Sequence, residues 1–146
     1  TMHRMASIIE ANVNIPILHI ADATAQRIKE QGIKSIGLLG TKFTMEQDFY
    51  KGRLIDKHGI TVIIPNDNDR NTVHSIIYNE LCQGQIKQPS KEQYMKIIEQ
   101  LKLNGAEGVI LGCTEIPLLI KQEDVSIPIF DTTRIHAEMA VTYALE

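Results

Sequence analysis

The most constraining feature of the sequence is the stretch from Gly108 to Pro117, which reads Gly-Val-Ile-Leu-Gly-Cys-Thr-Glu-Ile-Pro. Its first half is an apolar run between two glycines, typical of a strand that is covered on both faces in a parallel sheet. Its second half carries helix-start signals, because Thr114 is a suitable N-cap, Glu115 adds a first-turn carboxylate and Pro117 fits an early helical position. The stretch predicts a buried strand that ends at Cys113 and passes directly into a helix.

The position of Cys113 after this strand gives it chemical interest. In open α/β sheets, ligands bind outside the carboxyl ends of the strands. A thiol that faces the amides of a helix start is stabilised as a thiolate, which lowers its pKa, although the carboxylate of Glu115 opposes this effect. We therefore interpret Cys113 as a candidate reactive group. The alternative is a cysteine that packs as a small apolar side chain.

Predicted strands and helices alternate along the chain. Apolar runs predict strands at residues 15–20, 35–39, 60–64, 108–111 and 126–130. Helix-capping signals stand between them, at Asp22, Thr44 and Ser90, and a final helix is expected to begin at residues 131–133. This order predicts an α/β fold, a three-layer sandwich with a mainly parallel sheet that is flavodoxin-like in its broad order.

Composition narrows the classes of partner and cofactor. The 146 residues carry a formal net charge of −3 without a basic stripe, so we expect no nucleic-acid or anionic-lipid partner. The apolar runs are too short to cross a bilayer and no leader is recognisable, which predicts a soluble cytoplasmic protein without membrane contact. Cys82 and Cys113 form no Cys-x-x-Cys pair, and the five histidines lack metal-site spacing, so no metal is expected. We interpret Cys82 as a packing thiol at a helix end.

Four segments of the chain together match one known pattern. They are the Gly-Cys-Thr-Glu motif at 112–115, Ser-Ile-Gly-Leu-Leu-Gly-Thr at 35–41, Phe-Thr-Met-Glu-Gln-Asp-Phe-Tyr at 43–50, and Phe-Asp-Thr-Thr-Arg-Ile-His-Ala at 130–137. In content and order they resemble the aspartate/glutamate racemase family. The resemblance implies two similar α/β lobes with the site in the cleft between them. It makes residues 1–17 the tail of the first lobe, residues 18–130 the second lobe, and residues 131–146 a C-terminal helix that returns to the first lobe.

The same resemblance implies a reaction: racemisation of an acidic amino acid, aspartate or possibly glutamate in the family's terms, with neither pyridoxal phosphate nor another cofactor. Inversion at Cα needs one group that removes a proton and a second group that supplies one on the opposite face. Cys113 matches one of the family's two groups. The other would fall just before Thr1, so we expect the chain to be a fragment that lacks it. Glu115 stands where glutamate-specific relatives carry His, which favours the aspartate branch.

Further polar residues are candidates for substrate binding by their place in the family pattern or at a strand end. They are Thr1, Thr41, Thr44, Thr114 and Glu115. Thr41 and Thr44 offer hydroxyls to a carboxylate, but a turn and a helix cap explain them equally well. His136 is either a polar group on the terminal helix or a neighbour of the site.

Two alternatives to an acidic amino-acid racemase remain at this point. The first keeps the fold and changes the reaction, since related families with similar strand-end cysteines racemise hydantoins, isomerise maleate or decarboxylate malonates. The second is a non-catalytic domain that binds a small molecule or another protein. For either, we expect the surface that faces the missing lobe to be apolar and to favour a homodimer.

Overall fold

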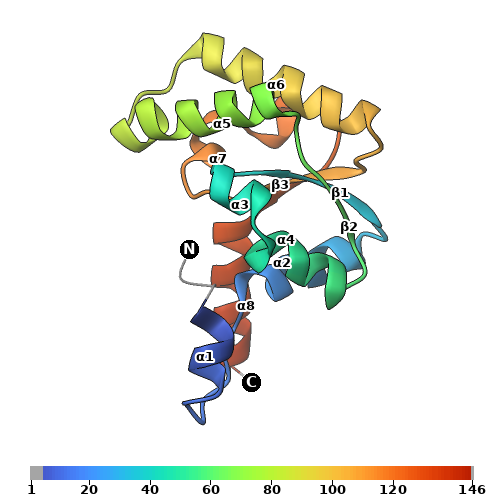
Figure 1. Ribbon diagram of the computed structural model, residues 1–146, viewed down its shortest axis with the longest axis vertical. Helices are drawn as coiled ribbons and strands as arrows, with labels where there is room; N and C mark the ends of the chain where they lie inside the picture. The colour runs from blue at the N-terminus through green and yellow to red at the C-terminus, as the bar shows by residue number, and fades with distance from the viewer. Residues whose placement is uncertain (1–4, 146) are drawn as a thin grey trace.

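The computed structural model describes residues 5–145 of the chain. Figure 1 shows how its helices and strands are arranged. The helices are α1 (Ala6–Glu10), α2 (Ile20–Glu30), α3 (Lys42–Glu46), α4 (Asp48–Asp56), α5 (Asp67–Asn79), α6 (Gln88–Leu103), α7 (Ile116–Leu119) and α8 (Thr132–Leu145), with short 3-10 helices η2 (Leu81–Gln83) and η3 (Gln122–Asp124). The strands are β1 (Ser35–Leu39), β2 (Thr61–Ile63), β3 (Gly108–Leu111) and β4 (Ile129–Asp131).

Within the described residues the strands form one parallel sheet in the order β2-β1-β3-β4. The central strands β1 and β3 pair from Ile36 opposite Gly108 to Leu39 opposite Leu111. Figure 1 shows α5 and α6 on one side of the sheet, and α2, α4 and α8 on the other. The predicted three-layer α/β architecture is therefore confirmed, with a strand order of the flavodoxin-like kind.

The core lies on both faces of the central strands. Every residue of β3 is buried, as the apolar run between two glycines predicts, and so are the last four residues of β1. Gly37 allows α6 to approach closely, because an added Cβ there would lie 3.1 Å from Leu101 Cδ1. The fully buried large side chains include Ile28, Leu38, Met45, Leu54, Tyr94, Ile110 and Phe130.

Of the five predicted strands, the one at residues 15–20 is absent. Residues 14–19 have no regular secondary structure, and α2 begins at Ile20. Ile15 is 73% exposed, which removes the burial that the apolar pattern predicted. The carbonyl of Leu18 accepts a hydrogen bond from His136 Nε2 of α8 at 2.7 Å. A helix side chain therefore occupies this carbonyl where a neighbouring strand was expected.

Helix starts also differ from the predicted caps. His19, and not Asp22, caps α2, because its Nδ1 accepts a hydrogen bond from the second residue of the helix. Thr41, and not Thr44, caps α3. Ser90 lies inside α6, which begins two residues earlier at a position without a side-chain cap. In each case a polar residue just upstream of the predicted cap, or the packing of the helix itself, sets the start.

Asp22 instead joins the start of α2 to the end of α4. Its carboxylate accepts two hydrogen bonds from Arg53, each of 2.8 Å, and one each from Lys57 and His58 at 2.7 Å and 2.8 Å. Burial opposes ionisation of Asp22, but these hydrogen bonds outweigh it and hold the pKa of this carboxyl well below its usual range. The cluster holds two helices together on one face of the sheet.

Candidate active site

The ends of β1 and β3 lie side by side at the carboxyl edge of the sheet. Gly112 N donates to Leu39 O across 2.7 Å, so the pairing continues one residue beyond β3. A Cβ at Gly112 would lie 2.9 Å from that oxygen, closer than real Cβ atoms come. Glycine at this position therefore lets the two strands stay together up to the residue before Cys113.

Thr41 and Thr44 follow β1 at the same edge. Thr41 Oγ1 accepts a hydrogen bond from Thr44 N at 3.4 Å, and the two hydroxyl oxygens lie 3.1 Å apart. Thr44 packs over both strand ends, because an added Cβ would lie 3.2 Å from its Cγ2 at Gly40 and 3.5 Å from it at Gly112. The two partly buried hydroxyls therefore lie beside the backbone that leads into Cys113.

Cys113 is half-buried, with one side packed on the core. Its Sγ donates to Glu115 Oε2 across 2.7 Å. Burial raises the pKa of the thiol, the hydrogen bond to Glu115 and the charge of that residue raise it further, and the backbone N–H of Glu115 acts in the opposite direction. Together these effects raise the pKa of Cys113 to about 12. The predicted lowering is wrong because the amide effect is present but smaller than burial and the carboxylate.

The helix predicted after Cys113 is present but short. It is α7, which has four residues. Glu115, and not Thr114, occupies its N-cap position, without a side-chain cap hydrogen bond. Hydrogen bonds from Cys113 and Thr114 lower the pKa of Glu115, which keeps it ionised. The carboxylate of Glu115 therefore affects the pKa of Cys113 more than the backbone N–H at the start of α7 does.

Two further buried polar side chains lie next to this edge, and no motif in the sequence indicated them. Thr132, at the start of α8, donates its hydroxyl to Leu111 O at 3.0 Å and so binds β4 to the last residue of β3. Tyr94 of α6 is fully buried and donates to Val73 O at 3.3 Å. Burial raises the pKa of Tyr94, and the charges of Cys113 and Glu80 raise it further. The effect of Tyr94 on Cys113 depends on how α6 packs, which no local sequence pattern indicates.

The sequence pattern of the Asp/Glu/hydantoin racemase family matches residues 1–140. The chain belongs to this family. The match includes the strand ends, both threonines and the Cys-Thr-Glu segment described above. The family resemblance noted in the sequence is thereby confirmed over nearly the whole chain.

Individual members of the racemase family are also similar. A proposed Asp/Glu racemase from Yersinia pestis, known from a crystal structure, shares 56% sequence identity with this chain. The two structures superpose with a TM-score of 0.97, and the match covers 99% of this chain and 63% of that protein. An aspartate racemase homologue from Pyrococcus horikoshii OT3 is 41% identical, with a TM-score of 0.90 and the same two coverages. The broad specificity amino-acid racemase RacX of Bacillus subtilis is 25% identical over 97% of this chain and 60% of RacX. The chain thus spans less than two thirds of each of these family members.

Three candidate residues remain, of which His136 lies on α8, Cys82 lies in η2 and Thr1 falls outside the described part of the chain. Thr1, which the family pattern places near the substrate, is outside residues 5–145, so its position is not described. His136 contacts the backbone of Leu18, as noted above, which is a structural role on α8. Cys82 lies in η2 and is exposed, so the expectation that it packs as a buried thiol is wrong.

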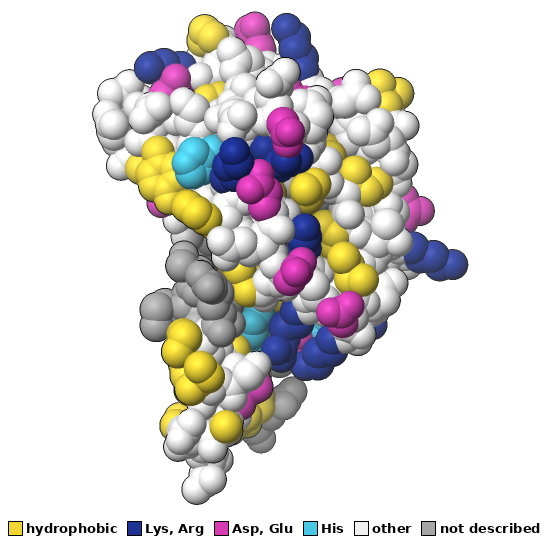
Figure 2. All heavy atoms as spheres, in the orientation of Figure 1, with side chains coloured by type: hydrophobic (Ala, Val, Ile, Leu, Met, Phe, Trp, Pro, Cys, Tyr) yellow, Lys and Arg dark blue, Asp and Glu magenta, His cyan; other side chains and the backbone are white. Residues whose placement is uncertain are grey.

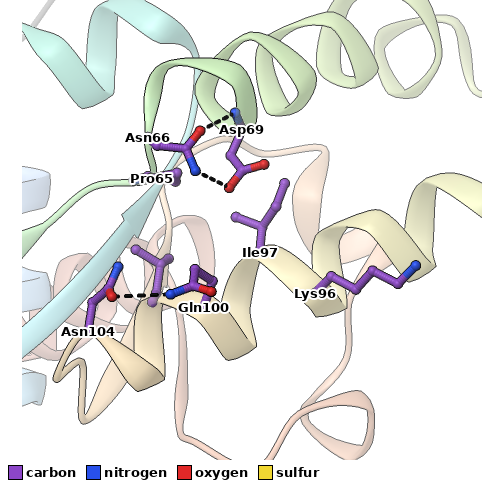
Figure 3. Close-up of a pocket in the computed structure, with 8 residues that line it drawn as sticks. Pro65, Asn66, Asp69, Lys96, Ile97, Gln100 and Asn104 are labelled. Carbon is purple, nitrogen blue, oxygen red and sulfur yellow. Dashed lines mark hydrogen bonds between the residues drawn. The ribbon is translucent and has the colours of Figure 1, made fainter.

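Four surface hollows lie on the described residues, and Cys113 lines none of the four. Figure 3 shows one of about 340 Å³ between the end of β2, the start of α5 and α6. Four of its five polar side chains already pair with one another, Asn66 with Asp69 and Gln100 with Asn104, and Lys96 is the fifth. This hollow therefore offers few free polar groups to a ligand, and the strand ends remain the better candidate site.

The described residues contain neither a metal-ligand cluster nor a helix suited to cross a membrane. Between residues 5 and 145, no three or more His, Cys, Asp or Glu side chains are grouped so that they could hold a metal ion. Over the same range, no helix combines the length and apolar character that a bilayer crossing requires.

Proposed function

We propose that this chain provides one half of the active site of an amino-acid racemase that acts on an acidic amino acid without a cofactor, with Cys113 as one of the two acid/base groups. The family to which the chain belongs supports racemase activity in general. The observation that carries the proposal is the half-exposed thiol at the carboxyl edge, directly after a central strand and beside two threonine hydroxyls. Ligands of open α/β sheets bind at this edge.

The proposed reaction requires two groups on opposite faces of the substrate. One group breaks the Cα–H bond and takes the proton, and the electron pair stays on carbon. The other group gives its proton to that carbon from the opposite face, which completes the inversion. Cys113 is one of these groups. The second belongs to the first lobe, in the segment that the family pattern places just before Thr1.

The acidic substrate is proposed from the edge residues as well as from the relatives. The hydroxyls of Thr41 and Thr44 are donors of the kind that orient a carboxylate, and Thr114, the residue after Cys113, is exposed. Glu115 is hydrogen-bonded to Cys113 and Thr114, so we assign it a role next to the thiol and not in binding the substrate's carboxylates. Aspartate is favoured over glutamate because Glu115 replaces the family's alternative histidine.

We also propose that residues 18–130 form the second lobe, that residues 1–17 are the tail of the first lobe, and that residues 131–146 return to that lobe. Support comes from apolar side chains that no part of the described chain covers. Figure 2 shows hydrophobic side chains gathered over α1. The exposed apolar side chains of α1, the segment after it and α8 are Met5, Ile8, Ile9, Val13, Ile15, Val141, Tyr143 and Leu145. A surface of this kind is typical of one that packs against another domain.

Without that lobe, the same surface favours association of two copies of the chain, and we propose a homodimer on these grounds. A cytoplasmic location is proposed with it, because both cysteines are free thiols, which is the usual state in a reducing compartment.

The decisive experiment is exchange of the substrate's α-proton with solvent deuterium, measured by mass spectrometry or NMR on a protein that carries both lobes. We expect exchange with aspartate and a loss of at least about 100-fold in Cys113→Ala, because a positioned acid/base group contributes about 10²–10⁴-fold. The matched control is Cys82→Ala, which removes the exposed thiol and should keep the rate. Full exchange in Cys113→Ala would reject the proposed role, and exchange with a hydantoin but not with aspartate would assign the reaction to another branch.

A further inference from the structure

Glu115 is unusually placed for a carboxylate next to a reactive thiol. Its Oε2 lies 2.7 Å from Cys113 Sγ, with a single residue between them in the sequence. Because an ionised carboxylate can only accept hydrogen bonds, this contact requires the proton to be on sulfur. The hydroxyl of Thr114 also hydrogen-bonds to Glu115 and helps to keep it ionised.

The other groups that act on Cys113 do not counter this carboxylate. From η2, Cys82 disfavours a second thiolate nearby. From α6, Tyr94 is fully buried and donates its hydroxyl to Val73 O, so it does not donate to the sulfur in this structure. Glu80 lies in the same neighbourhood and is itself occupied by Lys87 and Ser90. The backbone N–H of Glu115 is the group that favours the thiolate, and it is outweighed.

We propose that Glu115 is a positioning residue that keeps Cys113 protonated in the resting site and thereby makes this thiol the proton donor of the first half-reaction. This inference rests on the proposed function for its catalytic meaning. The hydrogen bond itself, and its effect on the thiol, concern residues of this chain alone.

In the proposed first half-reaction, the opposing group of the first lobe takes the α-proton, and the electron pair of the Cα–H bond stays on carbon. The S–H bond of Cys113 breaks, its proton bonds to that carbon, and its electron pair stays on sulfur. The product state therefore holds a thiolate beside the carboxylate of Glu115, two like charges in contact, which favours rapid return of a proton to sulfur.

This arrangement makes the two directions of racemisation unequal in their pH dependence. The enantiomer whose α-proton faces the opposing group reacts with Cys113 in its resting, protonated state. The other enantiomer needs the Cys113 thiolate, so its rate should keep rising with pH over the range in which the first rate has levelled off. Replacing Glu115 with glutamine removes the negative charge, and the amide N–H can then donate to a thiolate.

The experiment is alkylation with iodoacetamide over about pH 6 to 11, followed peptide by peptide by mass spectrometry on the chain as it stands. The pH at which the alkylation rate of Cys113 rises reports its thiolate, whereas limited access lowers the rate at every pH. The native midpoint of about 12 lies above this range, so the readout is the rate of Cys113 within it. In Glu115→Gln we expect alkylation at least about tenfold faster at a fixed pH near the top of the range, which corresponds to a midpoint lower by about one pH unit. Cys82 is exposed and lies on a separate peptide, so its alkylation is counted apart from that of Cys113.

Glu115→Asp separates charge from shape. It keeps the carboxylate on a chain shorter by one methylene, so the Cys113 midpoint should lie between those of the native chain and Glu115→Gln. An unchanged rate of Cys113 alkylation in Glu115→Gln, or a native Cys113 whose midpoint lies near the ordinary cysteine value of about 8.5, would overturn the inference. A shifted midpoint in a two-lobe protein that shows no α-proton exchange would instead reject the proposed racemase function and leave the role of Glu115 standing.

Discussion

The substitution Gly112→Ala tests the close contact between the ends of β1 and β3, where the candidate site lies. The substitution adds a single methyl group. Gly112 is not among the glycines with positive φ, so alanine can adopt its backbone conformation without strain. The only new constraint is contact, since the added Cβ would lie 2.9 Å from Leu39 O and 3.4 Å from Leu38 Cδ1. The nearest of these atoms is backbone and cannot rotate away.

The cost follows from how far the strands must separate. An ordinary contact of 3.4 Å needs about 0.5 Å of movement, which stretches the 2.7 Å hydrogen bond from Gly112 N to Leu39 O to about 3.2 Å. Overpacking costs about 1–3 kcal/mol and a weakened hydrogen bond up to about 1 kcal/mol. Alanine also restricts the unfolded chain more than glycine does, which stabilises the folded state by about 0.4–1 kcal/mol. We therefore expect a net loss of about 2 kcal/mol in the free energy of unfolding.

The assay is thermal and urea unfolding followed by circular dichroism. For a chain of this size, a loss of about 2 kcal/mol lowers Tm by about 4–8 °C. Gly52→Ala is the matched control, because its added Cβ meets side-chain atoms of α4 and no backbone, with Asp48 Cβ at 3.2 Å and Asp56 Oδ2 at 3.8 Å. There the higher helix propensity of alanine should leave Tm unchanged or raise it slightly. A Tm for Gly112→Ala within about 1 °C of the native value would refute the reasoning that close approach requires glycine here.

Two further predictions concern the helices on the opposite face and the surface of the chain. Asp22→Asn should lower the free energy of unfolding by about 2 kcal/mol at neutral pH, since it weakens charged hydrogen bonds to Arg53 and its neighbours. Because the folded pKa of Asp22 is depressed, this difference should be complete above the ordinary aspartate pKa and should narrow as pH falls below about 4, which urea unfolding at several pH values measures. The chain alone should form dimers in light scattering at high concentration, and Ile8→Ser with Val141→Ser, on two exposed apolar positions, should shift it toward monomers; a native chain that stays monomeric would contradict the proposed dimer.

The sheet could be predicted from the sequence because its central strands are buried on both faces. Residues 108–111 form one apolar run between glycines, and such a run has few other uses in a chain of this size. Residues 15–20 carry a similar run, but no strand pairs with them, and His136 occupies the Leu18 carbonyl. Local pattern shows that a segment is apolar, and only the tertiary arrangement decides whether a neighbouring strand is available.

The candidate site could be predicted in its position but not in its electrostatics. The strand-end rule placed Cys113 at the carboxyl edge, where the structure has it beside the end of β1. The direction of its pKa shift depends on how deeply the thiol is buried and on a balance between one amide and one carboxylate of the same residue, Glu115. Sequence gives the identity of these groups, whereas distance and burial decide which effect is larger.

The pairing of β1 with β3 has a consequence for how the site can vary. Thr41 and Cys113 are far apart in the sequence, yet each follows the end of one of two adjacent strands, about 4.8 Å apart in a parallel sheet. Their spacing is a property of the backbone ladder, and lengthening or shortening the connecting loops leaves it unchanged. A larger or smaller bound molecule must therefore be accommodated by exchange of the side chains at this edge or by the wall that faces it.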